Sequence, residues 1–263
     1  MAKEAVAMKR ILDLKLTEGQ AALWLLGQAG CVVRSGDMTV AIDPYLTDSV
    51  GAQDPAFARL FPPPIEPGRL EVDLFVVTHN HLDHLDPETV RRYPAKASTG
   101  FVAPRLAAAK LESLQVPPER IRRVDVGERR ELRGVAIRGV YALPTGPDVP
   151  DTTGYVLTFP NGRSLYHSSD TAFSPQLLGS APRAEVLLVA INGKWGNLDP
   201  EQAAELTAAV RPRFVLPNHY DLMARNSEDP EEFRRLCRDR KLPARCVVPA
   251  VMEPFVWEQS LRA

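Results

Sequence analysis

The chain contains 263 residues, of which 44 % are hydrophobic and 25 % charged, and its formal net charge is −1. This balance is that of a globular protein with one large domain, and it gives no electrostatic reason to expect nucleic acid or an anionic membrane as a partner. The three cysteines, Cys31, Cys237 and Cys246, form no CxxC pair, and no apolar run is long enough to span a bilayer. We therefore expect a cytoplasmic protein without stable membrane insertion.

The chain begins with a mildly amphipathic arm, residues 1–20. We expect a helix that packs on its own domain or on a second subunit, and both outcomes are favoured over a membrane-surface helix. A homo-oligomer therefore stays open. Residues 21–30, 31–46 and 72–80 are apolar, β-rich segments broken by Gly and Asp, which is typical of successive strands. A hairpin turn is predicted at 35–37.

A Pro-rich segment, residues 56–70, lies between two predicted strands and carries Phe57 and Phe61. A packed connection and a lid or substrate wall are about equally compatible with this composition. The segment is therefore predicted to be a rigid loop beside any site formed at the strand ends.

Two helices are predicted after the third of these strands. Asp86 followed by Pro87 is typical of a helix N-terminus, and Pro94 ends this short helix near Tyr93. Apolar residues at helical spacing predict a second helix over 104–114.

The second half of the chain returns to strands over 120–143 and then to a hairpin over 154–170, where Asn161-Gly162 fits the turn. The remaining predicted elements are strands over 184–192 and 213–219, capped helices over 199–210 and 229–239, and one or two closing strands over 246–258. Because no linker divides the chain, we expect a single domain over 1–263.

Residues 79–84 form the pattern H-x-H-x-D-H directly after a predicted buried strand. Alternate residues that leave a strand point the same way, so His79 and His81 can hold one metal ion together. Asp83 and His84, past the bend, can reach a second ion. Imidazole and carboxylate ligands suit zinc, manganese or iron.

Two further candidate ligands follow other predicted strands. Asp170 comes after the second strand of the Asn161-Gly162 hairpin, and His219 leaves the apolar strand over 213–219. If these strand ends gather at one edge of a sandwich, the polar side chains are tolerated there because they coordinate cations.

The motifs THNHLDH, HSSDT and PNHYD, in that order, resemble those of the metallo-β-lactamase superfamily. The chain is more specifically similar to the L-ascorbate-6-phosphate lactonase-like branch, through segments such as ALWLLGQAGCVVRSGDMTVAIDPY and VLPNHYDLMARNSEDPEEF that lie between about Ala21 and Arg240. That branch also resembles phospholipase-D-type enzymes that cleave N-acyl phosphatidylethanolamines. The chain is shorter than the lactonase between Leu143 and Thr153.

The resemblance implies an α/β fold of the α+β type, a four-layer αββα sandwich with two divalent transition-metal ions, zinc or manganese, at one edge. The implied ligands are His79 and His81 for one ion, Asp83, His84 and His219 for the other, and Asp170 as the bridge between them.

One implied ligand is missing. Family members commonly carry a further His or Asp after the strand that ends here near Leu143, where this chain has YALPTGPD. One metal position is then short of a ligand, or it is completed by water, by Asp148 or by His167. His167 lies three residues before Asp170, and strand alternation turns it to the opposite face, so a packed or ligand-supporting role is favoured.

Further residues beside the motifs are candidates for supporting the ligands or for binding substrate. In this fold an Asp such as Asp43, at the end of a strand, typically braces the metal loop. Asn192, Lys194 and Trp195 follow a predicted strand and can meet an anion and a ring of a substrate, although a plain turn fits equally well. Tyr220 adjoins the last histidine and can orient it or a leaving group.

We expect a metal-dependent hydrolase in which a metal-bound hydroxide attacks a small-molecule ester, in first place a lactone, with Asp83 as ligand and proton acceptor. Phosphodiesterase activity of the phospholipase D type, or nuclease activity, is the alternative on the same fold. A non-catalytic metal-binding scaffold is the alternative of another class. The Arg-rich residues 122–138 are interleaved with acids, so we expect a small-molecule substrate and no nucleic acid.

Overall fold

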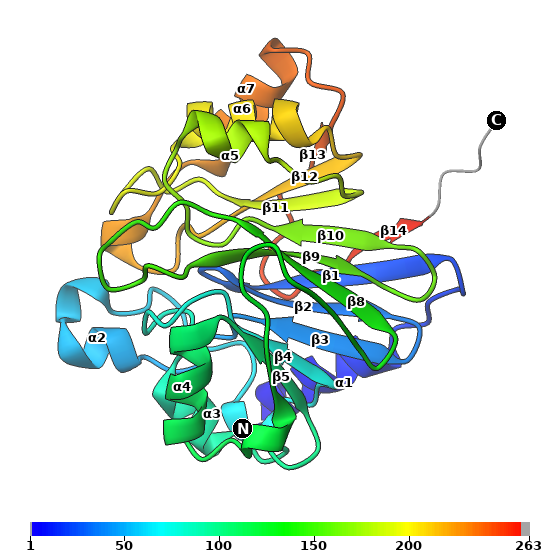
Figure 1. Cartoon of the computed structure of the whole chain (residues 1–263), viewed down its shortest axis with the longest axis vertical. Helices are drawn as coiled ribbons and strands as arrows, with labels where there is room; N and C mark the ends of the chain where they lie inside the picture. Colours follow the sequence, from blue (N-terminus) through cyan, green and yellow to red (C-terminus); the bar gives the residue numbers. More distant parts are fainter. Residues whose placement is uncertain (1, 259–263) are drawn as a thin grey trace.

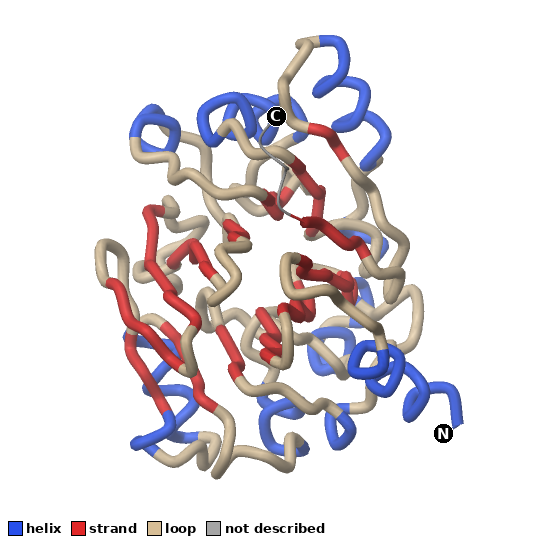
Figure 2. Tube along the Cα trace, turned by 90° about the vertical axis from the view of Figure 1, so that its right-hand side faces the viewer, coloured by secondary structure: helices blue, strands red, loops and turns tan. Residues whose placement is uncertain are grey.

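The computed structural model describes residues 2–258 and contains two seven-stranded sheets packed face to face, with helices on the outer side of each (Figure 1). Turned by 90°, the helices lie at the two ends of the view and the strands lie between them (Figure 2). This arrangement confirms the four-layer αββα sandwich.

The first sheet has the order β14-β1-β2-β3-β4-β5-β6. Its strands β1 to β3 are antiparallel, and the hairpin between β2 and β3 turns at the predicted place, since Ser35 pairs with Met38. From β3 to β6 the strands run parallel, so their carboxyl ends point to the same edge. The strands are β1 (Gln20–Gly27), β2 (Gly30–Ser35), β3 (Met38–Ile42), β4 (Leu74–Val76), β5 (Gly100–Ala103), β6 (Ile121–Arg123) and β14 (Phe255–Glu258).

The second sheet has the order β13-β12-β11-β10-β9-β8-β7. The predicted hairpin joins β9 to β10, and Gly162 in its turn has φ of 81°, a left-handed conformation that glycine adopts without strain. From β10 to β13 the strands are parallel. The strands are β7 (Arg129–Leu132), β8 (Val135–Tyr141), β9 (Thr153–Thr158), β10 (Ser164–His167), β11 (Val186–Ala190), β12 (Phe214–Asn218) and β13 (Arg245–Cys246).

One apolar layer joins the two sheets. Val33 and Val40 of the first sheet belong to the same buried cluster as Leu157, Leu188 and Leu216 of the second, and all five side chains are fully buried. Burial of this layer supplies the main favourable free energy for holding the sheets together. Because this layer holds the two sheets against each other, it also fixes the position of the parallel strand ends of one sheet relative to those of the other.

The predicted helix starts are confirmed by their caps. The side chains of Asp86, Asp199 and Asp229 each accept a hydrogen bond from a backbone N–H in the first turn of the helix that follows. The longer helices are α1 (Ala2–Asp13), α4 (Arg105–Ser113), α6 (Pro200–Val210) and α7 (Pro230–Asp239). The shorter ones are α2 (Ser49–Gln53), α3 (Pro87–Arg92), α5 (Pro175–Gly179) and the 3₁₀ turns η1 (Pro55–Phe57), η2 (Pro67–Arg69), η3 (Pro118–Arg120) and η4 (Ala224–Asn226).

Helix α1 packs on its own domain. Met8 and Ile11 are buried in the cluster on the outer face of the first sheet. At the C-terminus of the helix, the Arg34 guanidinium donates hydrogen bonds to the backbone carbonyls of Ile11 and Leu14, at 2.9 and 2.8 Å. These contacts satisfy carbonyls that a helix end leaves without an internal partner. Within residues 2–258, no helix combines the length and the apolar character that crossing a bilayer requires.

Candidate metal centre

The polar side chains singled out in the sequence gather at one edge of the sandwich. β3 is followed by Asp43, β4 by the histidine motif, β10 by Asp170 and β12 by His219. The strands that carry them belong to both sheets. Parallel strands end at the same edge, so segments far apart in the chain meet in one place.

One group consists of His79, His81 and Asp170. Each offers one ligand atom, and these atoms lie within 4.8 Å of one another. Nε2 of His79 is 2.9 Å from Nδ1 of His81. Tetrahedral zinc with bonds of about 2.0–2.1 Å brings two nitrogen ligands to roughly 3.3 Å, so a shared cation fits this spacing.

A second group consists of Asp83, His84 and His219, again with ligand atoms within 4.8 Å of one another. The Nε2 atoms of the two histidines lie 3.2 Å apart. Asp83 Oδ2 is 3.8 Å from Nε2 of His84 and 3.5 Å from Nε2 of His219. Two imidazoles that direct the same nitrogen at one point, beside a carboxylate, are a typical cation-binding arrangement.

Asp170 lies between the two groups. Its Oδ1 is 3.3 Å from Nε2 of His84 and 3.2 Å from Nε2 of His219, although the carboxylate also belongs to the first group. Oδ2 accepts a hydrogen bond of 2.8 Å from Asn197 Nδ2. Oδ1 is buried and accepts no hydrogen bond from any residue between 2 and 258. A buried carboxylate oxygen without a donor is costly, and a cation bound there would remove that cost.

Both carboxylates of the centre are held ionised. Burial alone would raise the pKa of Asp83, but the imidazoles of His84 and His219 outweigh it and lower that pKa below its usual range. The same two rings, His219 before His84, outweigh burial at Asp170 and hold its pKa well below the usual value. Burial tends to lower the pKa of His84, whereas Asp170 and Asp83 raise it well above the ordinary value. The centre therefore attracts positive charge.

Asp43 lies beneath the histidine motif. Its side chain is fully buried and accepts hydrogen bonds from the backbone N–H of Thr78 at 2.8 Å and from its hydroxyl at 2.6 Å. Its Oδ2 is 2.7 Å from Nδ1 of His84. A proton on Nδ1 leaves Nε2 of His84 free to coordinate a cation, so Asp43 sets both the ring orientation and the tautomer.

The structure separates the two residues that could complete the metal position lacking a ligand. Asp148 Oδ2 lies 3.0 Å from Nε2 of His81, the ring nitrogen that points away from His79. His167 is buried elsewhere, with Nε2 2.9 Å from the carbonyl of Ala29 and Nδ1 accepting from the backbone N–H of Ser169 at 3.1 Å. His167 is in neither ligand group found among the described residues.

Three residues at the centre were not singled out in the sequence. Gln28, in the turn between β1 and β2, donates from Nε2 to Asp83 Oδ2 at 2.8 Å, and its backbone carbonyl accepts a hydrogen bond from the backbone N–H of His219 at 2.8 Å. Asn226 lies 3.2 Å from Nδ1 of His219, and Asn197 bonds Asp170. The only local signal for Gln28 is its position as a polar residue in the short turn GQAG, residues 27–30, between two apolar segments.

The remaining predicted site residues, Asn192, Lys194 and Tyr220, differ in how they relate to the centre. Asn192 donates to Oδ1 of Asn226 at 2.7 Å and so supports the side chain that contacts His219. The ammonium of Lys194 donates to the carbonyl of Ser227. Tyr220 lines a separate small cavity, and burial raises its pKa.

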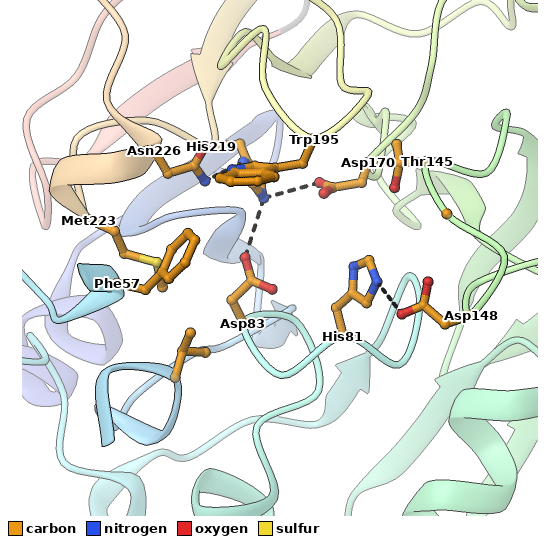
Figure 3. A pocket seen from close by; sticks show the side chains of 12 residues that line it. Phe57, His81, Asp83, Thr145, Asp148, Asp170, Trp195, His219, Met223 and Asn226 are labelled. Carbon is orange, nitrogen blue, oxygen red and sulfur yellow. Dashed lines mark hydrogen bonds and ion pairs between the residues drawn. The ribbon is translucent and has the colours of Figure 1, made fainter. Parts of the chain in front are cut away.

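A cavity of about 510 Å³ opens over the ligand atoms (Figure 3). Its floor contains the carboxylates of Asp83 and Asp170 and one imidazole from each group, that of His81 and that of His219, and its other wall is apolar. The lining residues are Val50, Phe57, His81, Asp83, Thr145, Gly146, Asp148, Asp170, Trp195, His219, Met223 and Asn226. A volume in this range suits a small-molecule substrate.

Comparisons with known proteins place the chain among metal-dependent hydrolases. Residues 39–220 match the family model described as the Beta-lactamase superfamily domain. A UPF0173 metal-dependent hydrolase of Hyperthermus butylicus is 30 % identical over 226 residues, which are 85 % of this chain and 93 % of that protein. A UPF0173 metal-dependent hydrolase of Aeropyrum pernix is 27 % identical over 91 % of this chain and 99 % of its own length.

Solved structures share the fold. The metallo hydrolase Igni18 of Ignicoccus hospitalis superposes with a TM-score of 0.72 at 23 % identity, covering 92 % of this chain and all of its own. An isothiocyanate hydrolase from Delia radicum gut bacteria has a TM-score of 0.72 at 17 % identity, covering 90 % of this chain and 99 % of its own.

Proposed function

The chain belongs to the beta-lactamase superfamily, and from that premise we propose that it is a metal-dependent hydrolase that cleaves a small-molecule ester, in first place a lactone. The observation that carries the proposal is the position of Asp170, whose Oδ1 accepts no hydrogen bond from the described residues and lies between two groups of converging imidazoles and carboxylates. The same arrangement argues against a scaffold role, because buried carboxylates and imidazoles stabilise a structural core no better than apolar side chains of similar volume would.

The proposed metal ligands are the six side chains of these two groups. His79 and His81 would hold one ion, Asp83, His84 and His219 the other, and Asp170 would bridge them. Zinc or manganese bound there would supply Lewis acidity and would lower the pKa of water from 15.7 to about 7. Asp148 would keep the ring of His81 oriented through its 3.0 Å contact with Nε2.

Asp83 is the proposed proton acceptor. Its side chain is 21 % exposed and lines the cavity, so it can reach both an attacking water and a leaving group. Its lowered pKa keeps it ionised, and Gln28 fixes Oδ2 through a hydrogen bond of 2.8 Å. A positioned carboxylate of this kind contributes about 10²- to 10⁴-fold to a hydrolytic rate.

The phosphodiesterase or nuclease alternative is less well supported by the cavity. Within the described chain, the residues that line it include three carboxylates and no Lys or Arg. A site for a phosphodiester usually offers cationic side chains to the phosphate oxygens. A neutral ester does not need such side chains.

The experiment is a hydrolysis panel with the metal-loaded protein. We expect turnover of lactones, and slower or no turnover of bis(p-nitrophenyl) phosphate and of a β-lactam. Asp83→Asn should lower lactone hydrolysis by at least about 10²-fold while the protein stays folded. Hydrolysis of the phosphodiester but of no lactone would overturn the proposed substrate class, and unchanged turnover of Asp83→Asn would remove Asp83 from the mechanism.

A further inference from the structure

The cavity has an apolar wall that the metal centre does not require. Phe57 of η1, Trp195 after β11 and Met223 before η4 line it from three separate segments of the chain (Figure 3). The rings of Phe57 and Trp195 have centroids 5.6 Å apart and are tilted by 54°. In Figure 3 the wall lies on the Asp83 side of the centre, opposite Asp148. A substrate held at the ligands would therefore extend over these rings.

Trp195 combines high solvent exposure with an unfavourable backbone conformation. It is 59 % exposed, more than any other exposed large hydrophobic residue in the part of the chain that the structure describes. Its φ is 56°, a left-handed conformation that bulky residues rarely adopt, and glycines with φ of 60° and 88° flank the Lys194-Trp195 pair. Gly196 lies close to the backbone of Thr145, another residue of the cavity lining. A Cβ at this glycine would lie 3.3 Å from the Thr145 carbonyl oxygen. Strain and exposure together at a cavity mouth indicate a ligand-binding role.

The cationic side chains near the wall are not among the residues that line the cavity. The ammonium of Lys194 donates to the carbonyl of Ser227. The Arg59 guanidinium donates to the carbonyls of Tyr45 and Phe61, at 2.9 and 3.1 Å. Arg225 lies over the ring of Phe57, 5.8 Å from its centroid. Among the described residues, the lining itself therefore offers no Lys or Arg to pair with an anionic substituent.

We propose that Phe57, Trp195 and Met223 form a binding face for an uncharged apolar chain or ring of the substrate. The substrate is then an apolar ester or alkyl lactone, and not a sugar phosphate. This inference rests on the proposed hydrolase function for the reaction, but the binding face itself can be tested without turnover. Burial of alkyl groups against aromatic side chains supplies the affinity, and the absence of Lys and Arg from the described lining disfavours an anionic substituent on this face.

The binding test uses 2-hexyltetrahydrofuran, an uncharged compound with no bond to hydrolyse, and Trp195 as its reporter. Trp24 and Trp257 are each 2 % exposed, so a ligand on the wall changes mainly the fluorescence of Trp195. We expect a saturable change with the hexyl compound at a concentration at least about tenfold lower than with tetrahydrofuran, since each buried CH₂ adds about 0.8 kcal/mol. Glucose 6-phosphate should give no saturable change. Tighter binding of the phosphate, or no advantage from the hexyl chain, would overturn the proposal.

Variants locate the binding face. In ligand-observed NMR, Trp195→Ala should weaken hexyl-compound binding at least about fivefold, while Trp195→Phe should retain most of it because a flat apolar ring remains. Val256→Ala, an exposed apolar residue on β14 outside the cavity lining, is the matched control and should bind as wild type does. Equal binding by Trp195→Ala and wild type would contradict the assignment.

Turnover then separates this inference from the function on which it rests. With γ-decalactone, Trp195→Ala should raise KM with little change in kcat, whereas the KM for γ-butyrolactone should rise less, because that substrate carries no alkyl chain to contact the wall. If the hexyl compound binds as expected but no ester or lactone is hydrolysed, the proposed reaction is wrong and the binding face stands. If lactones are hydrolysed without preference for the alkyl chain, the binding face is wrong and the hydrolase stands.

Discussion

Gln28 Nε2 lies 2.8 Å from Asp83 Oδ2, although 55 positions separate the two residues in the chain. The same amide nitrogen is 3.3 Å from Nε2 of His219, and the backbone carbonyl of Gln28 accepts a hydrogen bond from the backbone N–H of that histidine. One residue of the β1–β2 turn thus positions a carboxylate from the first sheet and an imidazole from the second.

Replacement of Gln28 tests this positioning role. Gln28→Leu keeps a similar volume but removes the hydrogen bond to Asp83, so hydrolysis should fall by about 10- to 100-fold and the metal affinity of the Asp83 group should weaken. Gln20→Leu is the matched control, because Gln20 also donates to a carboxylate, that of Glu258, outside the centre. Wild-type kinetics and metal affinity in Gln28→Leu would contradict the role.

Asp170 and His167 should differ in metal content. Asp170→Asn keeps the size of the side chain but removes the charge between the two groups, so it should lose one metal ion and nearly all activity. His167→Gln should keep both ions, since its ring nitrogens contact the Ala29 carbonyl and the Ser169 N–H. Elemental analysis of the two purified variants decides this. Equal loss of metal from both would make His167 a ligand.

Asp148 should act through His81. Asp148→Asn weakens the contact with Nε2 and should lower activity about 10- to 100-fold, with the amide still able to accept a hydrogen bond. Its side chain is 68 % exposed, so the fold should not depend on it. Asp37→Asn, in the exposed turn between β2 and β3, is the control. If Asp148→Asn instead loses a metal ion completely, Asp148 is itself the ligand that the strand ending near Leu143 does not supply.

The pH dependence of stability should carry a contribution from His167. Burial lowers its pKa, so the ring stays neutral in the folded protein while the unfolded chain takes up a proton below its ordinary value of about 6.5. The unfolded state then binds more protons, and stability falls as the pH drops below about 6.5 until the folded pKa is reached. Denaturant titrations at pH 8 and pH 5 should show a smaller loss for His167→Gln than for wild type. An equal loss would exclude His167 as a source.

The grouping of the proposed ligands could be predicted because their signals are local. His79 to His84 form one contiguous motif, and Asp170 and His219 each follow an apolar strand whose end defines its position in a parallel sheet. The helix starts at Asp86, Asp199 and Asp229 were predictable for the same reason, since a cap depends on residues within one turn.

The supporting residues could not be predicted because their contacts are tertiary. Gln28 meets Asp83 only once β1 to β4 have assembled into the first sheet, and no periodic pattern marks it. Helices α2 and α5 are five residues long, too short for a hydrophobic period to be visible. For the loop over 56–70, the sequence is compatible with a packed connection and with a substrate wall. In the structure Phe57 lines the cavity, while Phe61 packs against the cluster of Tyr45 and Leu222.

The metal content of the wild-type protein tests the central claim most directly. The purified protein, incubated with Zn²⁺ or Mn²⁺ and freed of unbound ions, should retain two ions per chain by elemental analysis. His84→Ala removes an imidazole that contacts Asp43 and belongs to the group of Asp83 and His219, so this variant should retain fewer ions. No bound transition metal in the wild-type protein after incubation with either ion would contradict the account.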